Sequence, residues 1–129
     1  MVAQRARSST VIELQNTGTV AEPVYAGIPT TLVSFNGSNG VYPIARLTAD
    51  ASGDLFGTTG GGGAYGNGTV SEIQNTGTAA EPVYAGIPTT LVSFDAYNGA
   101  YPAAGLIADA SGDLFGIPRG LRLFLEFLQ

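Results

Sequence analysis

Short runs of alternating apolar and polar residues recur along the chain, each only five or six residues long. In residues 30–35, TTLVSF, Leu32 and Ser34 point to one side of a predicted strand, and Val33 and Phe35 point to the other. Three more segments rich in strand-forming residues lie at 10–14, 45–50 and 55–59. No segment in the body of the chain keeps a 3.6-residue apolar period, so the pattern predicts short β-strands.

These strands occur twice, because residues 10–57 and 69–116 are two copies of one sequence displaced by 59 positions. Of the 48 aligned positions, 10 differ and 38 are identical, and residues 21–35 recur unchanged as 80–94. The second set of strands is therefore expected at residues 69–73, 89–94, 104–109 and 114–117. A repeat of this length indicates that one structural unit is stacked on its copy.

The connecting segments favour tight reversals of the chain. Residues 51–54 and 110–113, both ASGD, are expected to close hairpins, and GGGGAYGNG at 60–68 is expected to form a longer reversal. Each unit is therefore predicted to be a four-stranded antiparallel meander. Small sheets of this kind must stack on a neighbour, and radial stacking gives a β-propeller of roughly four to eight blades. The predicted fold class is all-β, with two antiparallel four-stranded repeat units forming an incomplete, propeller-like array.

The copies divide the chain into four predicted parts. Residues 1–9 are an N-terminal tail, 10–68 the first repeat unit, 69–117 a truncated second unit, and 118–129 a divergent C-terminal tail. Within that last part, residues 121–128 alternate in a way that permits a strand in place of the missing one, while their leucine content equally permits a short helix. Both ends depart from the repeat pattern, as expected for an interrupted array.

Composition and charge exclude several classes of function. Glycine supplies 19 of the 129 residues, which fits many tight turns. Between residues 10 and 117, Arg46 is the single basic residue against nine carboxylates, a net charge of −8. Such a surface repels phosphate backbones, so we expect no nucleic-acid partner. No apolar run approaches the roughly 20 residues of a membrane span, and no apolar signal core follows the charged N-terminus. The sequence thus predicts neither a membrane span nor a signal peptide in this chain.

Three segments resemble units of the bacterial GloVer tandem-repeat family: TLVSFNGSNGVYP (31–43), DASGDLFGTTGGGGAYGNGTV (50–70) and LIADASGDLFG (106–116). The resemblance covers about residues 10–117. It implies an exported or cell-surface bacterial protein with many copies, a propeller-like fold and no established catalytic activity, and it supplies no functional residues. Ser71 stands where the family prefers an aromatic residue, which predicts a poorer core.

Asp50 and Asp54 flank the first tight turn, and Asp109 and Asp113 flank its copy. Carboxylates together with turn carbonyls are ligands that Ca²⁺ accepts, so these four residues are the candidate metal site. The alternative is that they cap the turns by accepting hydrogen bonds from nearby backbone N–H groups. Paired carboxylates also serve glycoside hydrolysis, but no tryptophan or histidine accompanies them. No cofactor other than Ca²⁺ is expected.

The sequence also disfavours catalysis. It has no histidine and no cysteine, so the usual general base and thiol nucleophile are absent, and no serine sits in a GxSxG elbow. Residues 61–66 satisfy GxGxxG, but the strand-like segment GTVSE follows where a dinucleotide site needs a helix. We therefore predict that this segment is a loop and that the protein is not an enzyme.

Six tyrosines lie mainly in the links, where they either fill gaps between sheets or contact a ligand: Tyr25, Tyr42, Tyr65, Tyr84, Tyr97 and Tyr101. The function expected from all of this is a non-catalytic structural or interaction module from an exported bacterial repeat protein. It is expected to bind a protein partner, or to self-associate, through sheet edges. The alternatives are a carbohydrate- or Ca²⁺-binding propeller fragment, and a decayed open reading frame without an independent function.

Overall fold

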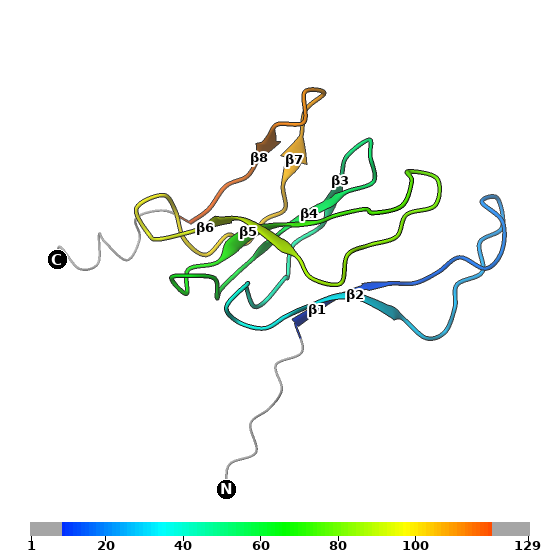
Figure 1. The fold of residues 1–129 in the computed structure, drawn as a ribbon, viewed down its shortest axis with the longest axis horizontal. Coiled ribbons are helices and arrows are strands. Elements are labelled where there is room, and N and C mark those ends of the chain that lie inside the picture. The colour runs from blue at the N-terminus through cyan, green and yellow to red at the C-terminus, as the bar shows by residue number, and fades with distance from the viewer. Residues whose placement is uncertain (1–8, 120–129) are drawn as a thin grey trace, which may run out of the picture.

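The computed structural model describes residues 9–119, which form an all-β structure of eight strands in three antiparallel sheets (Figure 1). The strands are β1 (Ser9–Glu13), β2 (Thr30–Phe35), β3 (Thr48–Ala49), β4 (Leu55–Thr59), β5 (Thr69–Ile73), β6 (Thr89–Ser93), β7 (Ile107–Ala108) and β8 (Leu114–Phe115). This part of the chain contains no helix that could cross a membrane. The all-β, antiparallel prediction is confirmed.

One complete sheet lies between two half-sheets. The central sheet has the order β3-β4-β5-β6, whereas β1 pairs only with β2, and β7 only with β8. The prediction of one four-stranded sheet for each unit is therefore wrong. The central sheet takes two strands from each sequence copy, and its middle pair, β4 and β5, joins them. The structure has one complete sheet where the sequence analysis expects two.

The physical reason lies in the links between strands. The glycine-rich loop after β4 reverses the chain tightly, so β5 returns beside β4, with Thr59 opposite Thr69. The longer link between β2 and β3 instead crosses over the end of the central sheet. The N–H of Val41 in this link donates to the carbonyl of Gly61 at 2.9 Å, and Pro43 follows with no N–H to donate. This link carries the chain from one sheet to the next.

A buried row of hydroxyl groups holds β4 and β5 together near that loop. The Oγ1 atoms of Thr59 and Thr69 are 2.7 Å apart, and Thr69 Oγ1 is 3.1 Å from Ser71 Oγ. Both threonines are fully buried, and Ser71 exposes only 2% of its surface. Because these hydroxyls bond to one another, they lie in the interior without the cost of unpaired polar groups.

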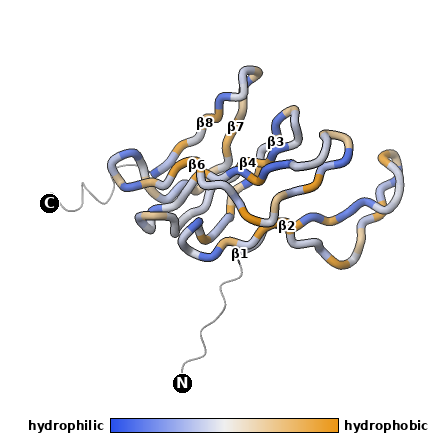
Figure 2. Tube along the Cα trace, viewed as in Figure 1, coloured by the Kyte–Doolittle hydropathy of each residue, from blue (hydrophilic) through white to orange (hydrophobic). Residues whose placement is uncertain are grey.

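The half-sheets cover opposite faces of the central sheet, as Figure 1 shows for β1–β2 below it and β7–β8 above. On the first face, Val11, Val33 and Phe35 of β1–β2 form the apolar core with Ile73 of β5. On the other face, the hydroxyl of Thr58 donates to the carbonyl of Ala104 at 3.1 Å, in the segment before β7. Apolar positions lie both in the strands and in the exposed long loops (Figure 2).

Five of the eight strand predictions agree with the structure within one residue, and three do not. Residues 45–50 and 104–109 were expected to be strands, but only the two-residue strands β3 and β7 form there. The residues before β3 belong to the crossing link, in which Tyr42 takes a positive φ of 59°. The predicted strand at 114–117 ends at Phe115, because no third strand pairs with β8 among residues 9–119. The strand or helix predicted at 121–128 lies outside the described residues.

The core makes a first prediction. Ile73→Val should lower the free energy of unfolding by about 0.5–1.5 kcal/mol, because Ile73 is only 2% exposed between the two sheets. Ile28→Val is the matched control, since Ile28 is 83% exposed and the same change there should cost no more than about 0.5 kcal/mol. Urea unfolding measures both. Equal losses in the two variants would contradict the stacking of β1–β2 on the central sheet.

Candidate functional site: the aspartate turns and the open sheet edges

The first aspartate turn is a tight, side-chain-capped reversal between β3 and β4. Asp50 Oδ1 accepts hydrogen bonds from the backbone N–H groups of Ser52 and Asp54, both at 3.0 Å. Gly53 takes a φ of 85°, which a residue with a side chain rarely adopts, and its N–H donates to the Asp50 carbonyl at 3.1 Å. Asp50 therefore caps the turn, as one of the two sequence hypotheses states.

The second turn repeats this geometry between β7 and β8. Asp109 Oδ1 accepts from Ser111 and Asp113 at 3.0 and 2.9 Å, and Gly112 again has a φ of 85°. The two turns lie side by side and together line a shallow depression. Among residues 9–119, however, no three or more acidic or other ligating side chains are arranged to hold a metal ion. A Ca²⁺ site at these four aspartates stays a prediction.

Asp54 accepts a hydrogen bond from outside its own turn, whereas its copy Asp113 does not within residues 9–119. Its Oδ1 accepts the backbone N–H of Asn75 at 2.7 Å, just after β5. Asn75 Nδ2 in turn donates to the carbonyl of Ser52 at 2.8 Å. The first aspartate turn is thereby tied to the segment that leaves β5. Within residues 9–119, no residue takes the place of Asn75 beside Asp113.

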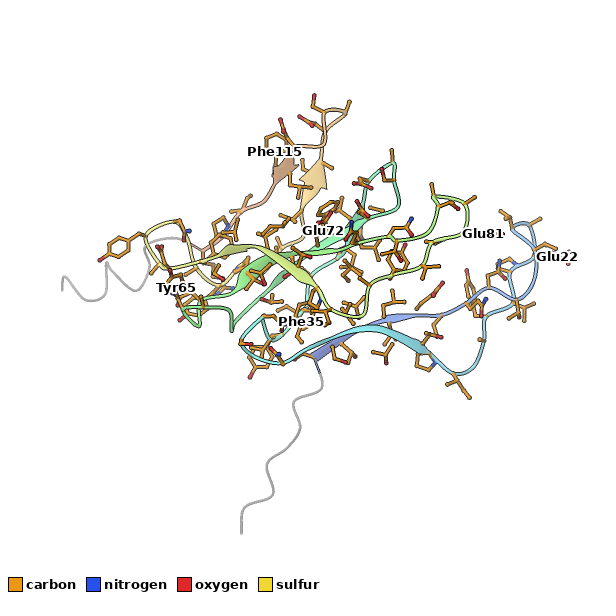
Figure 3. All side chains as sticks on the ribbon, viewed as in Figure 1. Glu22, Phe35, Tyr65, Glu72, Glu81 and Phe115 are labelled. Carbon is orange, nitrogen blue, oxygen red and sulfur yellow. The ribbon has the colours of Figure 1, made fainter. Side chains whose placement is uncertain are left out.

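Glu72 on β5 lies beside the same turn (Figure 3). Partial burial raises the pKa of its carboxyl group, and the negative charges of Asp54 and then Asp50 raise it further. A side-chain hydrogen bond with Asp54 also favours the protonated form of Glu72. Glu72 does not stand out in the sequence, because the register that places it opposite Phe56 joins two different repeat copies.

The GxGxxG segment forms a loop between two strands, as predicted. Gly62 and Gly63 take φ values of 70° and 81°, and the strand β5 follows. A Cβ atom on Gly62 would lie 2.5 Å from the carbonyl oxygen of Gly37, so the close approach of two backbones requires glycine here. The loop contacts the crossing link, and no helix N-terminus follows to face a pyrophosphate.

The segments 15–29 and 74–88 form two matching long loops at one end of the molecule. Asn16 Oδ1 accepts from Gly18 and Val24 at 2.9 Å, and Asn75 Oδ1 accepts from the equivalent residues at the same distance. Figure 3 shows Glu22 and Glu81 near their tips. Tyr84 packs against the apolar core, but the other five tyrosines are exposed. The gap-filling interpretation therefore holds for one tyrosine of the six.

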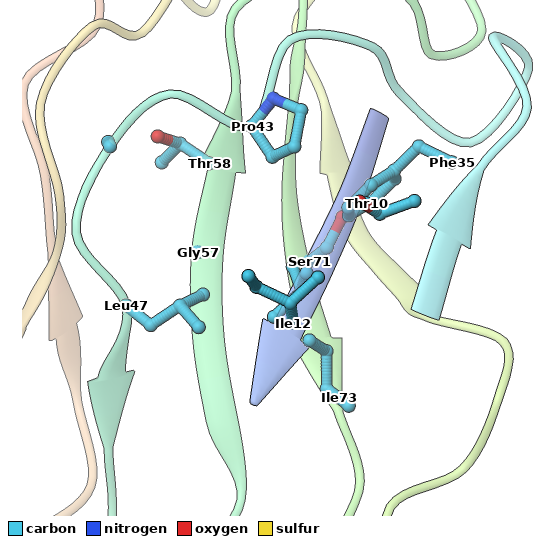
Figure 4. Close-up of a pocket in the computed structure, with 11 residues that line it drawn as sticks. Thr10, Ile12, Phe35, Pro43, Leu47, Gly57, Thr58, Ser71 and Ile73 are labelled. Atoms are coloured by element: carbon cyan, nitrogen blue, oxygen red, sulfur yellow. The ribbon is translucent and has the colours of Figure 1, made fainter. Parts of the chain in front are cut away.

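A groove of about 190 Å³ lies between β1 and the central sheet (Figure 4). Ile12 and Thr10 of β1 form one side, and Pro43, Ala45 and Leu47 of the crossing link form the other. Its floor includes Gly57, which has no side chain, and Ser71, whose side chain is small. The groove is mostly apolar, and no ionisable side chain lines it. It lies beside the position where the sequence analysis expected a poorer core.

Both half-sheets expose apolar side chains that their copies in the central sheet do not. Phe115 on β8 is 52% exposed, whereas its copy Phe56 in the central sheet is 8% exposed. On β1, Ile12 is 50% exposed, whereas its copy Ser71 is 2% exposed. Equivalent positions thus differ in burial because the central sheet has a neighbour on both faces and each half-sheet has one.

Comparison with known proteins adds no relative: no protein-family model, curated protein or solved structure matches the chain. The resemblance to the GloVer repeats stays a prediction from the sequence. The geometry therefore carries the functional argument. It offers open sheet edges and exposed apolar faces rather than an enclosed polar cleft.

The aspartate cap makes a second prediction. Asp50→Ala removes two hydrogen bonds to backbone N–H groups and should lower the free energy of unfolding by about 1–2 kcal/mol. Asp50→Asn keeps the accepting oxygen and relieves repulsion with Glu72, so it should leave stability unchanged or slightly higher. Thermal or urea unfolding compares the two variants. If asparagine is as harmful as alanine, the carboxylate has a role beyond the cap.

A third prediction concerns the pH dependence of stability, which follows from the raised pKa of Glu72. Because the folded-state pKa of Glu72 is raised, its contribution to stability is fully present below the unfolded-state pKa and is lost as the pH rises through the folded-state pKa. Glu72→Gln should therefore raise the melting temperature at pH 7. At about pH 3, below the ordinary glutamate pKa, the two proteins should differ much less. A benefit that is the same at both pH values would contradict the proposed repulsion.

Proposed function

We propose that this chain is a non-catalytic structural and interaction module, an incomplete propeller-like piece of an exported bacterial repeat protein. It acts by joining its open sheet edges to a protein partner or to further copies of itself. The observation that carries the proposal is the arrangement of one complete sheet between two half-sheets, each with an unpaired edge strand among residues 9–119.

The exposed side chains on these half-sheets support an interaction role. Ile107, Phe115 and Ile117 are 69%, 52% and 80% exposed, and they lie on or next to β7–β8. Unpaired strand edges beside apolar surface favour pairing with another chain. The acidic repeat body and the absence of histidine and cysteine support a protein partner over nucleic acid or catalysis.

A fourth prediction tests this function. Light scattering of the purified full chain over a wide range of concentration should give a mass above that of one chain, decreasing on dilution. The control is Ile87→Lys, which adds a charge at a residue that is 78% exposed in the loop between β5 and β6, outside both half-sheets. Ile117→Lys should weaken the association while Ile87→Lys leaves it unchanged. A folded protein that keeps the mass of one chain at every concentration would contradict self-association.

A further inference from the structure

We propose that β8 of one copy pairs with β1 of a second copy, so that two half-sheets complete one four-stranded sheet. The inference rests on the proposed function and names its partner and contact. The occupant of each open edge is the opposite edge of the same protein. The chain already contains the pattern for this contact, in the pairing of β4 with β5.

The sequence repeat makes the two contacts equivalent. A shift of 59 positions takes Leu55–Thr59 to residues 114–118, and takes β5 back to residues 10–14. In the central sheet, Leu55 lies opposite Ile73 and Phe56 opposite Glu72. The same register between copies places Leu114 opposite Leu14 and Phe115 opposite Glu13.

The hydrogen bonds between the first aspartate turn and Asn75 have one set of partners at each end of the described chain, without the other set. Asp54 accepts the N–H of Asn75, and Asn75 donates to the carbonyl of Ser52. At one end of the described chain, Asp113 and Ser111 have this turn geometry without the asparagine. At the other end, Asn16 has the asparagine loop without the aspartate turn. The proposed pairing brings Asp113 of one copy to Asn16 of the next.

The same contact buries the exposed apolar residues. In the central sheet, Phe56 is buried and Thr58 donates to Ala104, in a segment that includes Pro102 and Leu106. The counterparts of Pro102, Ala104 and Leu106 are Pro43, Ala45 and Leu47, which line the groove beside β1.

Phe115 and Ile117 of a second copy therefore fit this groove. The second sequence copy suits such a site, because isoleucines replace the two hydrogen-bonding threonines of the first. Thr48 and Thr58, which donate to the carbonyls of Leu106 and Ala104, correspond to Ile107 and Ile117. An apolar face is then presented to an apolar groove.

Each chain in such an assembly would supply one complete sheet and half of each of two shared sheets. If the sheets close into a ring of roughly four to eight blades, about two to four copies are needed. The contact is head-to-tail, because different surfaces of the two copies meet, and repeated contacts of this kind form rings or filaments.

A cysteine cross-linking experiment on the full chain tests the pairing, since the native sequence has no cysteine. In the double variant Glu13→Cys/Phe115→Cys, the new thiols lie directly opposite each other across the proposed strand pair. The control is Ile12→Cys/Phe115→Cys, because a shift of one residue places the thiols on opposite faces of the sheet. Within one molecule, the central sheet separates β1 from β8, so any such disulfide joins two copies.

Under mild oxidation, the in-register variant should give a several-fold larger cross-linked fraction than the control, as a ladder of covalent multimers. Light scattering of the unmodified chain is measured in parallel. Association without preferential cross-linking would overturn the β8–β1 pairing while leaving the proposed interaction role in place. A folded chain that stays single at all concentrations would overturn both.

Discussion

The pairing of β4 with β5 is the interaction on which the rest of this structure depends. It joins the end of one sequence copy to the start of the next in a single sheet, with Thr59 opposite Thr69 and Leu55 opposite Ile73. Only this pair spans both copies in the middle of a sheet. The buried hydroxyls of Thr59, Thr69 and Ser71 fix one part of it, and Ile73 connects the other part to the apolar core.

A four-stranded sheet this small has two faces to cover, and this constraint explains the two half-sheets. Val11, Val33 and Phe35 cover one face, while the segment around Ala104 and Leu106 covers the other. The same constraint applies to the half-sheets themselves, which leave Ile12 exposed beside the groove and Phe115 exposed on β8. The surface that the fold leaves uncovered is therefore the surface from which we infer its function.

Much of the local structure could be predicted from residue patterns. Alternation located β2, strand-forming residues located β4, and the ASGD turns close hairpins capped by Asp50 and Asp109. The grouping of strands into sheets could not be predicted in the same way. The repeat shows which segments are equivalent but not where one sheet ends. A sequence that repeats every 59 residues can be divided into equivalent units at any position within that period. In the structure, the long link between β2 and β3 separates two sheets. The neighbourhood of Glu72 could not be predicted, because it depends on this grouping.

In this fold the boundary between sheets falls between β2 and β3 rather than between β4 and β5. Nuclear Overhauser effects between backbone protons of facing strands test this most directly. We expect strong contacts between Gly57 and Ser71, which face each other across the two copies. The alternative grouping, with one sheet for each copy, would instead give contacts between β2 and β3. Those contacts in place of the Gly57–Ser71 contact would contradict the arrangement from which the functional proposals follow.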